Sequence, residues 1–148
     1  MTSATPAGCR VYLVDTCVIS EIRKRDKANK GITKFFRQAA KDDAALYLCA
    51  VTVGELRRGV ELIHHCGDTA QAKRLDTWLK LILSEYHDNI LPLDGDAAQV
   101  WGRLRVPHPE NALDKQIAAI ALIHDLTLVT RNEKHFADTG AKLLNPFQ

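Results

Sequence analysis

The sequence predicts an α/β domain in which helices cover a central parallel sheet. Short apolar segments alternate along the chain with longer segments whose apolar residues recur at helical spacing, and this alternation is typical of a parallel sheet with helices on its faces. The 148 residues amount to one domain, for which about 100–200 residues are usual. Apolar residues make up 46% and charged residues 26%, which excludes a disordered or low-complexity chain.

Five short apolar segments are the predicted strands. Runs that are apolar on both faces suit strands buried inside a parallel sheet. Pro92 interrupts the third run. Because proline cannot donate a ladder hydrogen bond, we expect this strand at an edge of the sheet or the proline near a strand end. The five segments are residues 11–15, 45–51, 90–94, 127–130 and 142–145.

Six segments between these runs are predicted as helices, because their apolar residues recur every three or four positions. The charged residues 23–31 are expected to form a solvated connector, and Pro107 and Pro109 mark a turn. Without an internal repeat or a domain boundary, the chain divides into a flexible segment over residues 1–10 and one domain over residues 11–148. The predicted helices lie at about residues 16–22, 32–39, 52–65, 75–83, 95–106 and 112–124.

Composition also bears on where the protein acts. No apolar stretch comes near the roughly 18 residues of a membrane helix, and residues 1–9 lack the basic start and apolar core of a secretory signal. The four cysteines show neither a C-x-x-C pair nor zinc-knuckle spacing. We therefore expect a cytoplasmic protein without membrane contact. The net charge of +2 neither indicates nor excludes a nucleic-acid partner.

Polar residues follow the predicted strands at the sheet edge where parallel α/β proteins bind ligands. Asp15 ends the first strand, Glu55 lies at the start of the helix after the second, and Asp114 begins the helix after the proline-rich turn. The polar residues 130–133 follow the fourth strand. Taken alone, each carboxylate is better explained as a helix cap: Asp15 as an N-cap, and Glu55 and Asp114 as the acidic residues of capping boxes that begin at Thr52 and Asn111. We assign Asp94 and Asp96 to capping alone.

Three carboxylates without a histidine or cysteine among them favour a hard cation, Mg²⁺ or Mn²⁺. Such a site suits hydrolysis of phosphodiesters, because the cation polarises the phosphoryl oxygen and generates hydroxide near neutral pH. The chain contains none of the usual motifs of nucleotide-binding proteins, serine hydrolases or zinc proteases. The residues alone thus indicate a metal-dependent phosphohydrolase and no more.

The segments that carry these residues resemble, in order and spacing, the successive motifs of PIN-domain proteins. The similarity is greatest to the VapC- and FitB-type toxins of bacterial toxin–antitoxin pairs and extends over nearly the whole chain, from about Val11 to Phe147. The matching segments include Leu13-Val14-Asp15-Thr16, Val51-Thr52-Val53-Gly54-Glu55, Ala112-Leu113-Asp114, Leu128-Val129-Thr130-Arg131-Asn132 and Asn145-Pro146-Phe147.

The resemblance implies a three-layer α/β/α domain that acts as an endoribonuclease dependent on Mg²⁺ or Mn²⁺. It also implies a homodimer held inactive by a small antitoxin, with operator DNA bound only through that antitoxin. The alternative is a weakly active or inactive PIN subunit whose main role is to bind its antitoxin in a DNA-binding repressor complex.

The resemblance further implies roles for individual residues. Asp15 and Asp114 match direct metal ligands, Glu55 matches an acid that binds the metal through water or activates the attacking water, and Thr16 matches a supporting hydroxyl. The fourth catalytic position holds Asn132, where many relatives have aspartate, either there or three residues later at the position of His135. Asn132 carries no negative charge, and the neighbouring Glu133 is the carboxylate that could supply one. Because this charge is missing, the alternative of a weakly active, antitoxin-binding subunit stays open.

Basic residues near these motifs are expected either to be solvated or to hold the RNA backbone. Arg57 and Arg131 are the main candidates for binding substrate phosphates, with Arg58, Lys115 and Lys134 beside them. Aromatic residues make up only 6% of the chain, so we expect recognition of RNA by backbone and shape rather than by extensive base stacking.

Overall fold

A computed structural model describes residues 10–148. A five-stranded parallel sheet of order β3-β2-β1-β4-β5 forms its middle layer, which confirms the predicted α/β architecture. The flexible segment predicted for residues 1–10 lies, except for Arg10, outside the described residues. The strands are β1 (Val11–Val14), β2 (Ala45–Cys49), β3 (Ile90–Leu91), β4 (Thr127–Val129) and β5 (Leu143–Leu144).

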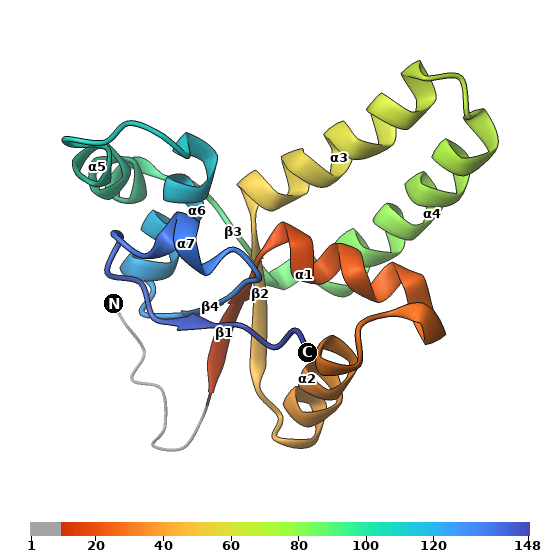
Figure 1. Ribbon diagram of the computed structural model, residues 1–148, viewed down its shortest axis with the longest axis horizontal. Helices are drawn as coiled ribbons and strands as arrows, with labels where there is room; N and C mark the ends of the chain where they lie inside the picture. Colours follow the sequence, from red (N-terminus) through yellow and green to blue (C-terminus); the bar gives the residue numbers. More distant parts are fainter. Residues whose placement is uncertain (1–9) are drawn as a thin grey trace.

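Helices cover both faces of this sheet (Figure 1). The third predicted strand ends directly before Pro92 and is an edge strand, as expected. The connector expected over residues 23–31 is instead mostly a 3-10 helix, and the short α7 was not predicted. The helical elements are α1 (Thr16–Glu21), η1 (Ile22–Lys27), α2 (Lys30–Lys41), α3 (Ala50–His65), α4 (Thr69–Glu85), η2 (His87–Asn89), α5 (Gly95–Leu104), α6 (Ala112–Ile123) and α7 (Glu133–Phe136).

The central strand β1 divides the apolar interior into two cores. Tyr12 and Val14 pack into a core with residues of α1 to α4, whereas Leu13 packs into a second core with residues of α5 to α7. Successive side chains of a strand point to opposite faces, so the uninterrupted apolar run of β1 serves both layers. The three-layer arrangement therefore follows from a strand that is apolar at every position.

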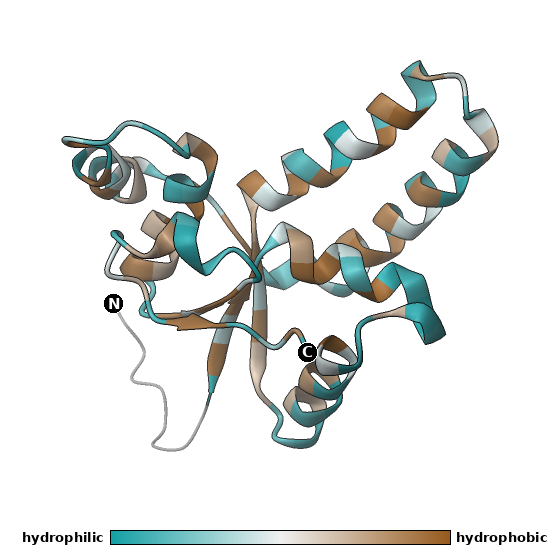
Figure 2. Ribbon diagram, in the orientation of Figure 1, coloured by the Kyte–Doolittle hydropathy of each residue, from teal (hydrophilic) through white to brown (hydrophobic). Residues whose placement is uncertain are grey.

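Helices α3 and α4 form a hairpin that projects from the sheet (Figure 1). Gly67 in its turn has a φ of +91°, a conformation that favours glycine and ends α3. The hairpin carries apolar residues along one side and hydrophilic ones along the other (Figure 2). Leu79 and Ile82 of α4 are buried in the first core, so the apolar side anchors the hairpin to the sheet.

Strand register brings three chain segments to one edge of the sheet. Leu13 is paired with Tyr47 of β2, and Val14 with Val129 of β4. Asp15, which directly follows Val14, therefore lies level with the start of α3 and with the turn after β4. The backbone N–H of Asp15 donates to the Val129 carbonyl over 3.0 Å, which continues the ladder up to the carboxylate. Among the described residues, no helix is both long and apolar enough to cross a membrane.

Candidate active site

Asp15 is the buried centre of the site. Its side chain lies at the end of β1, and the residue is only 3% exposed. Oδ1 accepts a hydrogen bond from the Thr16 amide over 2.8 Å, which caps α1. Oδ2 accepts from the Thr130 hydroxyl over 2.8 Å and from the Cys17 thiol over 3.6 Å. Capping and a functional role are thus compatible for this residue.

Burial raises the pKa of the Asp15 carboxyl above its ordinary value. The hydrogen bonds from Thr130 and Thr16 oppose this rise, and the negative charge of Asp114 adds to it. Burial and the adjacent Asp15 charge also raise the pKa of the Cys17 thiol, to about 11. Cys17 therefore keeps its proton at neutral pH and can donate it to the carboxylate.

Glu55 faces the same region from the second turn of α3. Its Oε1 accepts a hydrogen bond from the Thr16 hydroxyl over 3.0 Å, and Thr52 Oγ1 lies 3.2 Å from that hydroxyl. The capping box expected for Thr52 and Glu55 is wrong, because α3 begins at Ala50 and Thr52 is buried inside its first turn. Burial raises the pKa of the Glu55 carboxyl, and the charges of Asp15 and Asp114 raise it further.

Asp114 occupies the first turn of α6 and pairs with a histidine. Its Oδ2 lies 2.9 Å from Nδ1 of His135. The capping interpretation for Asn111 and Asp114 is wrong as well, since Asn111 has a left-handed backbone (φ 55°) and no capping hydrogen bond from its side chain. Because it pairs with His135, the Asp114 carboxylate is turned toward α7 rather than toward the backbone of its own helix.

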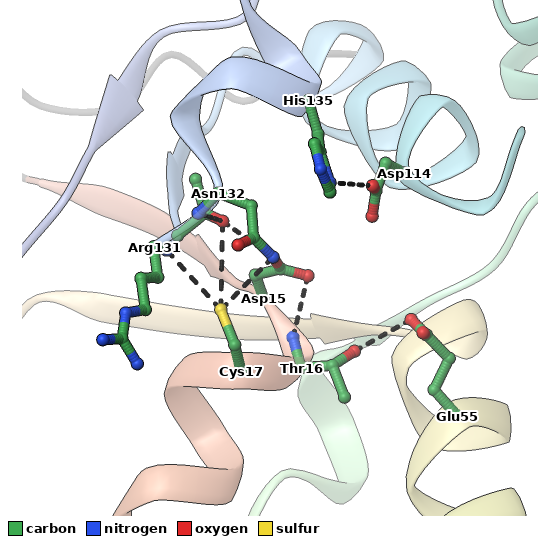
Figure 3. A network of polar contacts seen from close by, with 9 residues as sticks. Asp15, Thr16, Cys17, Glu55, Asp114, Arg131, Asn132 and His135 are labelled. Carbon is green, nitrogen blue, oxygen red and sulfur yellow. Dashed lines mark hydrogen bonds and ion pairs between the residues drawn. The ribbon is translucent and has the colours of Figure 1, made fainter. Parts of the chain in front are cut away.

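The three carboxylates face a common space at the edge of the sheet (Figure 3). They do not yet converge on one point: across residues 10–148, no three histidine, cysteine, aspartate or glutamate side chains are close enough to hold a single ion. Asp114 is nevertheless near enough for its charge to add to the rise in pKa that burial causes in both Asp15 and Glu55. Neither Asp15 nor Glu55 forms an ion pair with a described residue.

This donor set fits a divalent cation chemically. Carboxylate oxygens are the ligands that Mg²⁺ and Mn²⁺ prefer. A cation among them would oppose the rise in pKa that burial and the neighbouring charges cause in Asp15 and Glu55, and would keep these carboxyls ionised. Closing the set around one ion requires side-chain rotation of Glu55 and Asp114, both of which are only partly buried.

The turn after β4 supplies a support that the sequence analysis did not assign. The Thr130 hydroxyl is buried between Asp15 and the backbone N–H of Asn132, which donates to it over 3.0 Å. The Arg131 amide donates to Cys17 Sγ over 3.5 Å. A threonine that ends a buried apolar strand was the available signal, because a buried hydroxyl requires a partner.

Asn132 and Glu133 are exposed at the start of α7. The Asn132 side chain makes no capping hydrogen bond to α7, so its amide remains available to the site (Figure 3). Within the described chain Glu133 forms no ion pair. The structure brings Asn132 near Asp15 through Thr130 and gives no contact between Glu133 and the carboxylates.

The two arginines predicted to bind phosphates have other partners. The Arg57 guanidinium lies 2.8 Å from Asp76 and 3.5 Å from Glu61, and so links α3 to α4. The Arg131 guanidinium stacks on the ring of Phe147 at 4.8 Å and points away from the carboxylates (Figure 3). Neither guanidinium is placed to bind a phosphate beside the three carboxylates.

Lys115 and Trp101 fix the segment before α6. The buried Lys115 ammonium donates to the His108 carbonyl, and the Trp101 indole donates to the Ala112 carbonyl over 3.0 Å. These two bonds hold the turn after α5 against the first residues of α6. They thereby fix the helix end that carries Asp114.

Comparison with known proteins assigns the family. The model of the PIN domain matches residues 12–142. Toxin FitB of Neisseria gonorrhoeae is 33% identical over 143 residues, which cover 93% of this chain and 99% of that protein. VapC ribonuclease Y4jK of Sinorhizobium fredii is 28% identical over 146 residues, with the same coverage. The structure of FitAB bound to an IR36 DNA fragment superposes with a TM-score of 0.74 at 30% identity, over 93% of this chain and 96% of that one.

The structure has a parallel sheet with acidic residues at the edge where β1, α3 and α6 meet. This arrangement is the one expected of PIN-domain proteins. The chain belongs to the PIN-domain family. Within that family it is similar to the FitB- and VapC-type toxins, which confirms the resemblance drawn from its motifs.

Proposed function

We propose that this chain is the toxin of a toxin–antitoxin pair and acts as an endoribonuclease that depends on Mg²⁺ or Mn²⁺. The observation that carries the proposal is that the carboxylates of Asp15, Glu55 and Asp114 face one space at the edge of the sheet, with raised pKa values for the first two. Similarity to a VapC ribonuclease supports RNA as the substrate.

Each carboxylate has a distinct role in this proposal. Asp15 and Asp114 hold the cation, and Asn132 contributes an amide oxygen. Glu55 either binds the cation through a water molecule or takes the proton of the attacking water. Its half-buried carboxyl has a raised pKa, which suits a general base. Thr16 positions Glu55 through its hydroxyl. A bound divalent cation supplies electrostatic stabilisation of the phosphoryl oxygens and of the attacking and leaving groups.

The partners follow from the same similarity. FitAB was solved as a complex on DNA, and we assign to this chain a small antitoxin as partner, with operator DNA reached only through it. We also propose a homodimer and a cytoplasmic site of action, where RNA is available. Arg57 and Arg131 would contact substrate phosphates only after leaving Asp76 and Phe147, so the structure gives these two roles no support.

Cleavage of single-stranded RNA by the purified, antitoxin-free chain tests the activity. We expect cleavage with Mg²⁺ or Mn²⁺, none with EDTA, and losses of at least about 100-fold for Asp15→Asn and Asp114→Asn, because metal and acid–base roles are each worth orders of magnitude. Asp88→Asn is the matched control, since the Asp88 carboxylate is exposed on η2 and pairs with His87 of the same element. Full activity of both site variants would disprove the assignment.

One observation favours the second candidate, a weakly active subunit that mainly binds its antitoxin. The fourth position holds the neutral Asn132, and the carboxylates do not converge on one ion in their present positions. Calorimetric titration with Mn²⁺ in the presence of RNA separates the two functions. Absence of Mn²⁺ binding together with tight binding of the antitoxin supports the subunit role.

A further inference from the structure

His135 lies where it can complete the carboxylate site. Its Nδ1 is 2.9 Å from Oδ2 of Asp114, and its side chain is 48% exposed. The imidazole comes from α7 and the carboxylate from α6, and the ring faces the same space as Asp15 and Glu55 (Figure 3). In the sequence, His135 stands at a position where many relatives have aspartate.

We propose that His135 is a nitrogen ligand of the cation held by the carboxylates, next to Asp114, and that it shifts the preference of the site from Mg²⁺ toward transition ions such as Mn²⁺ and Co²⁺. This inference rests on the proposed metal-dependent function and specifies the ion that it uses.

The spacing of the two donor atoms agrees with this role. Two neighbouring ligands of an octahedral ion with bonds of about 2.1 Å lie about 3.0 Å apart, close to the separation of 2.9 Å between Nδ1 and Oδ2. A coordinating imidazole nitrogen carries no proton. The neutral ring meets this condition when its single proton is on Nε2, which solvent can reach because the ring is half exposed.

The position of His135 is fixed by its neighbours in the chain. The next residue, Phe136, is buried in the second core. The His135 amide donates to the Asn132 carbonyl over 3.0 Å, and the Asn132 amide in turn donates to Thr130. This chain of contacts ties α7 to Thr130, whose hydroxyl also binds Asp15. These contacts hold the backbone at His135, and the contact of its ring with Asp114 orients the side chain before an ion binds.

Ligand chemistry gives the direction of the preference. Mg²⁺ demands oxygen ligands and keeps its waters, whereas imidazole suits first-row transition ions. A site of carboxylates with Asn132 alone would favour Mg²⁺ or Mn²⁺ by charge, and adding one imidazole favours the transition ion. The alternative role for His135 is a hydrogen bond to Asp114 without any bond to the ion.

Pulsed electron paramagnetic resonance of the Mn²⁺-loaded full chain distinguishes these roles. We expect the electron-spin-echo modulation of a directly coordinated ¹⁴N in the unmodified chain and in His124→Ala, a control at the far end of α6, and its loss in His135→Ala. By calorimetry, His135→Ala should weaken Mn²⁺ binding about 10-fold or more and Mg²⁺ binding less. His135→Asp should reverse the preference in favour of Mg²⁺.

The outcomes separate this inference from the proposed function. Bound Mn²⁺ without nitrogen coupling, or an unchanged ratio of Mn²⁺ to Mg²⁺ affinity in His135→Ala, overturns the inference and leaves the nuclease intact. Nitrogen coupling in a chain that cleaves no RNA supports the inference and overturns the nuclease. Failure of Mn²⁺ to bind overturns both the inference and the metal dependence.

Discussion

The Thr130 hydroxyl donates a hydrogen bond to Asp15 Oδ2 over 2.8 Å and thereby joins the ends of two neighbouring strands. The Thr130 hydroxyl oxygen also accepts a hydrogen bond from the backbone N–H of Asn132 over 3.0 Å. One buried hydroxyl therefore orients the central carboxylate and begins the turn that leads to α7. Because both partners are held by a single side chain, the consequences of changing Thr130 are specific.

Thr130→Val should destabilise the protein by about 1–3 kcal/mol, because the substitution keeps the shape but leaves Asp15 Oδ2 with only the weak Cys17 thiol donor and the Asn132 amide without its acceptor. The pKa of Asp15 should rise, since Thr130 lowers it. Urea unfolding measures the first effect, and a shift of the acidic limb of the RNA-cleavage profile to higher pH measures the second. Thr130→Ser retains the hydroxyl, so its stability in urea and its acidic limb should match those of the unmodified chain. A Thr130→Ser variant as impaired as Thr130→Val would contradict the role of the hydroxyl.

Asp15→Asn should stabilise the metal-free protein at neutral pH. The pKa values of Asp15 and Glu55 are raised on folding from ordinary values of 3.8 and 4.5. The native state thus holds these protons more tightly than the unfolded chain does. The contribution of these two carboxyls to the free energy of unfolding is fully present below their pKa values in the unfolded chain. It is lost as the pH rises through their raised pKa values in the native state. Removing one carboxylate should raise Tm at pH 7.5 in EDTA and flatten the fall of Tm above about pH 4.

Melting curves across pH in EDTA check this, with Asp88→Asn as control because that exposed carboxylate lies on η2. An Asp15→Asn variant that melts below the unmodified chain at pH 7.5 would show that the carboxylate is stabilised in the native state, contrary to our expectation.

Cys17 should resist alkylation although it borders the site. Burial and the Asp15 charge raise its pKa to about 11, so the reactive thiolate is scarce at pH 7.5. Cys66, exposed at the end of α3, serves as the internal reference. Mass spectrometry after brief treatment with iodoacetamide should find Cys66 modified at least about 10-fold faster than Cys17. Equal rates would mean that Cys17 is neither buried nor hydrogen-bonded to Asp15 in solution.

Arg57→Ala should leave RNA cleavage unchanged. Its guanidinium is held by Asp76 and Glu61 between α3 and α4, where exposed ion pairs contribute little to stability. We expect KM and kcat within about twofold of the unmodified chain and little change in Tm. A many-fold rise in KM with kcat retained would instead restore the phosphate-binding role that the sequence predicted.

Local pattern was sufficient for the architecture. Uninterrupted apolar runs predicted the strands, helical spacing predicted the six longer helices, and Pro92 predicted an edge strand or a nearby strand end, because these features depend on neighbours in the chain. Order of elements then located Asp15, Glu55 and Asp114 at one sheet edge. The errors were local in kind as well: the capping boxes at Glu55 and Asp114 did not form, because α3 begins at Ala50 and Asn111 has a left-handed backbone.

The sequence by itself thus determined the α/β class, the family motifs and the chain positions of the three carboxylates, because hydrophobic periodicity and strand order are encoded along the polymer. Only the tertiary structure decided that Thr130 and Cys17 surround Asp15, that His135 meets Asp114, and that Arg57 pairs with Asp76. Those contacts join side chains from different helices and strands, and their geometry is set by packing of the two cores against the sheet, which no local spacing records.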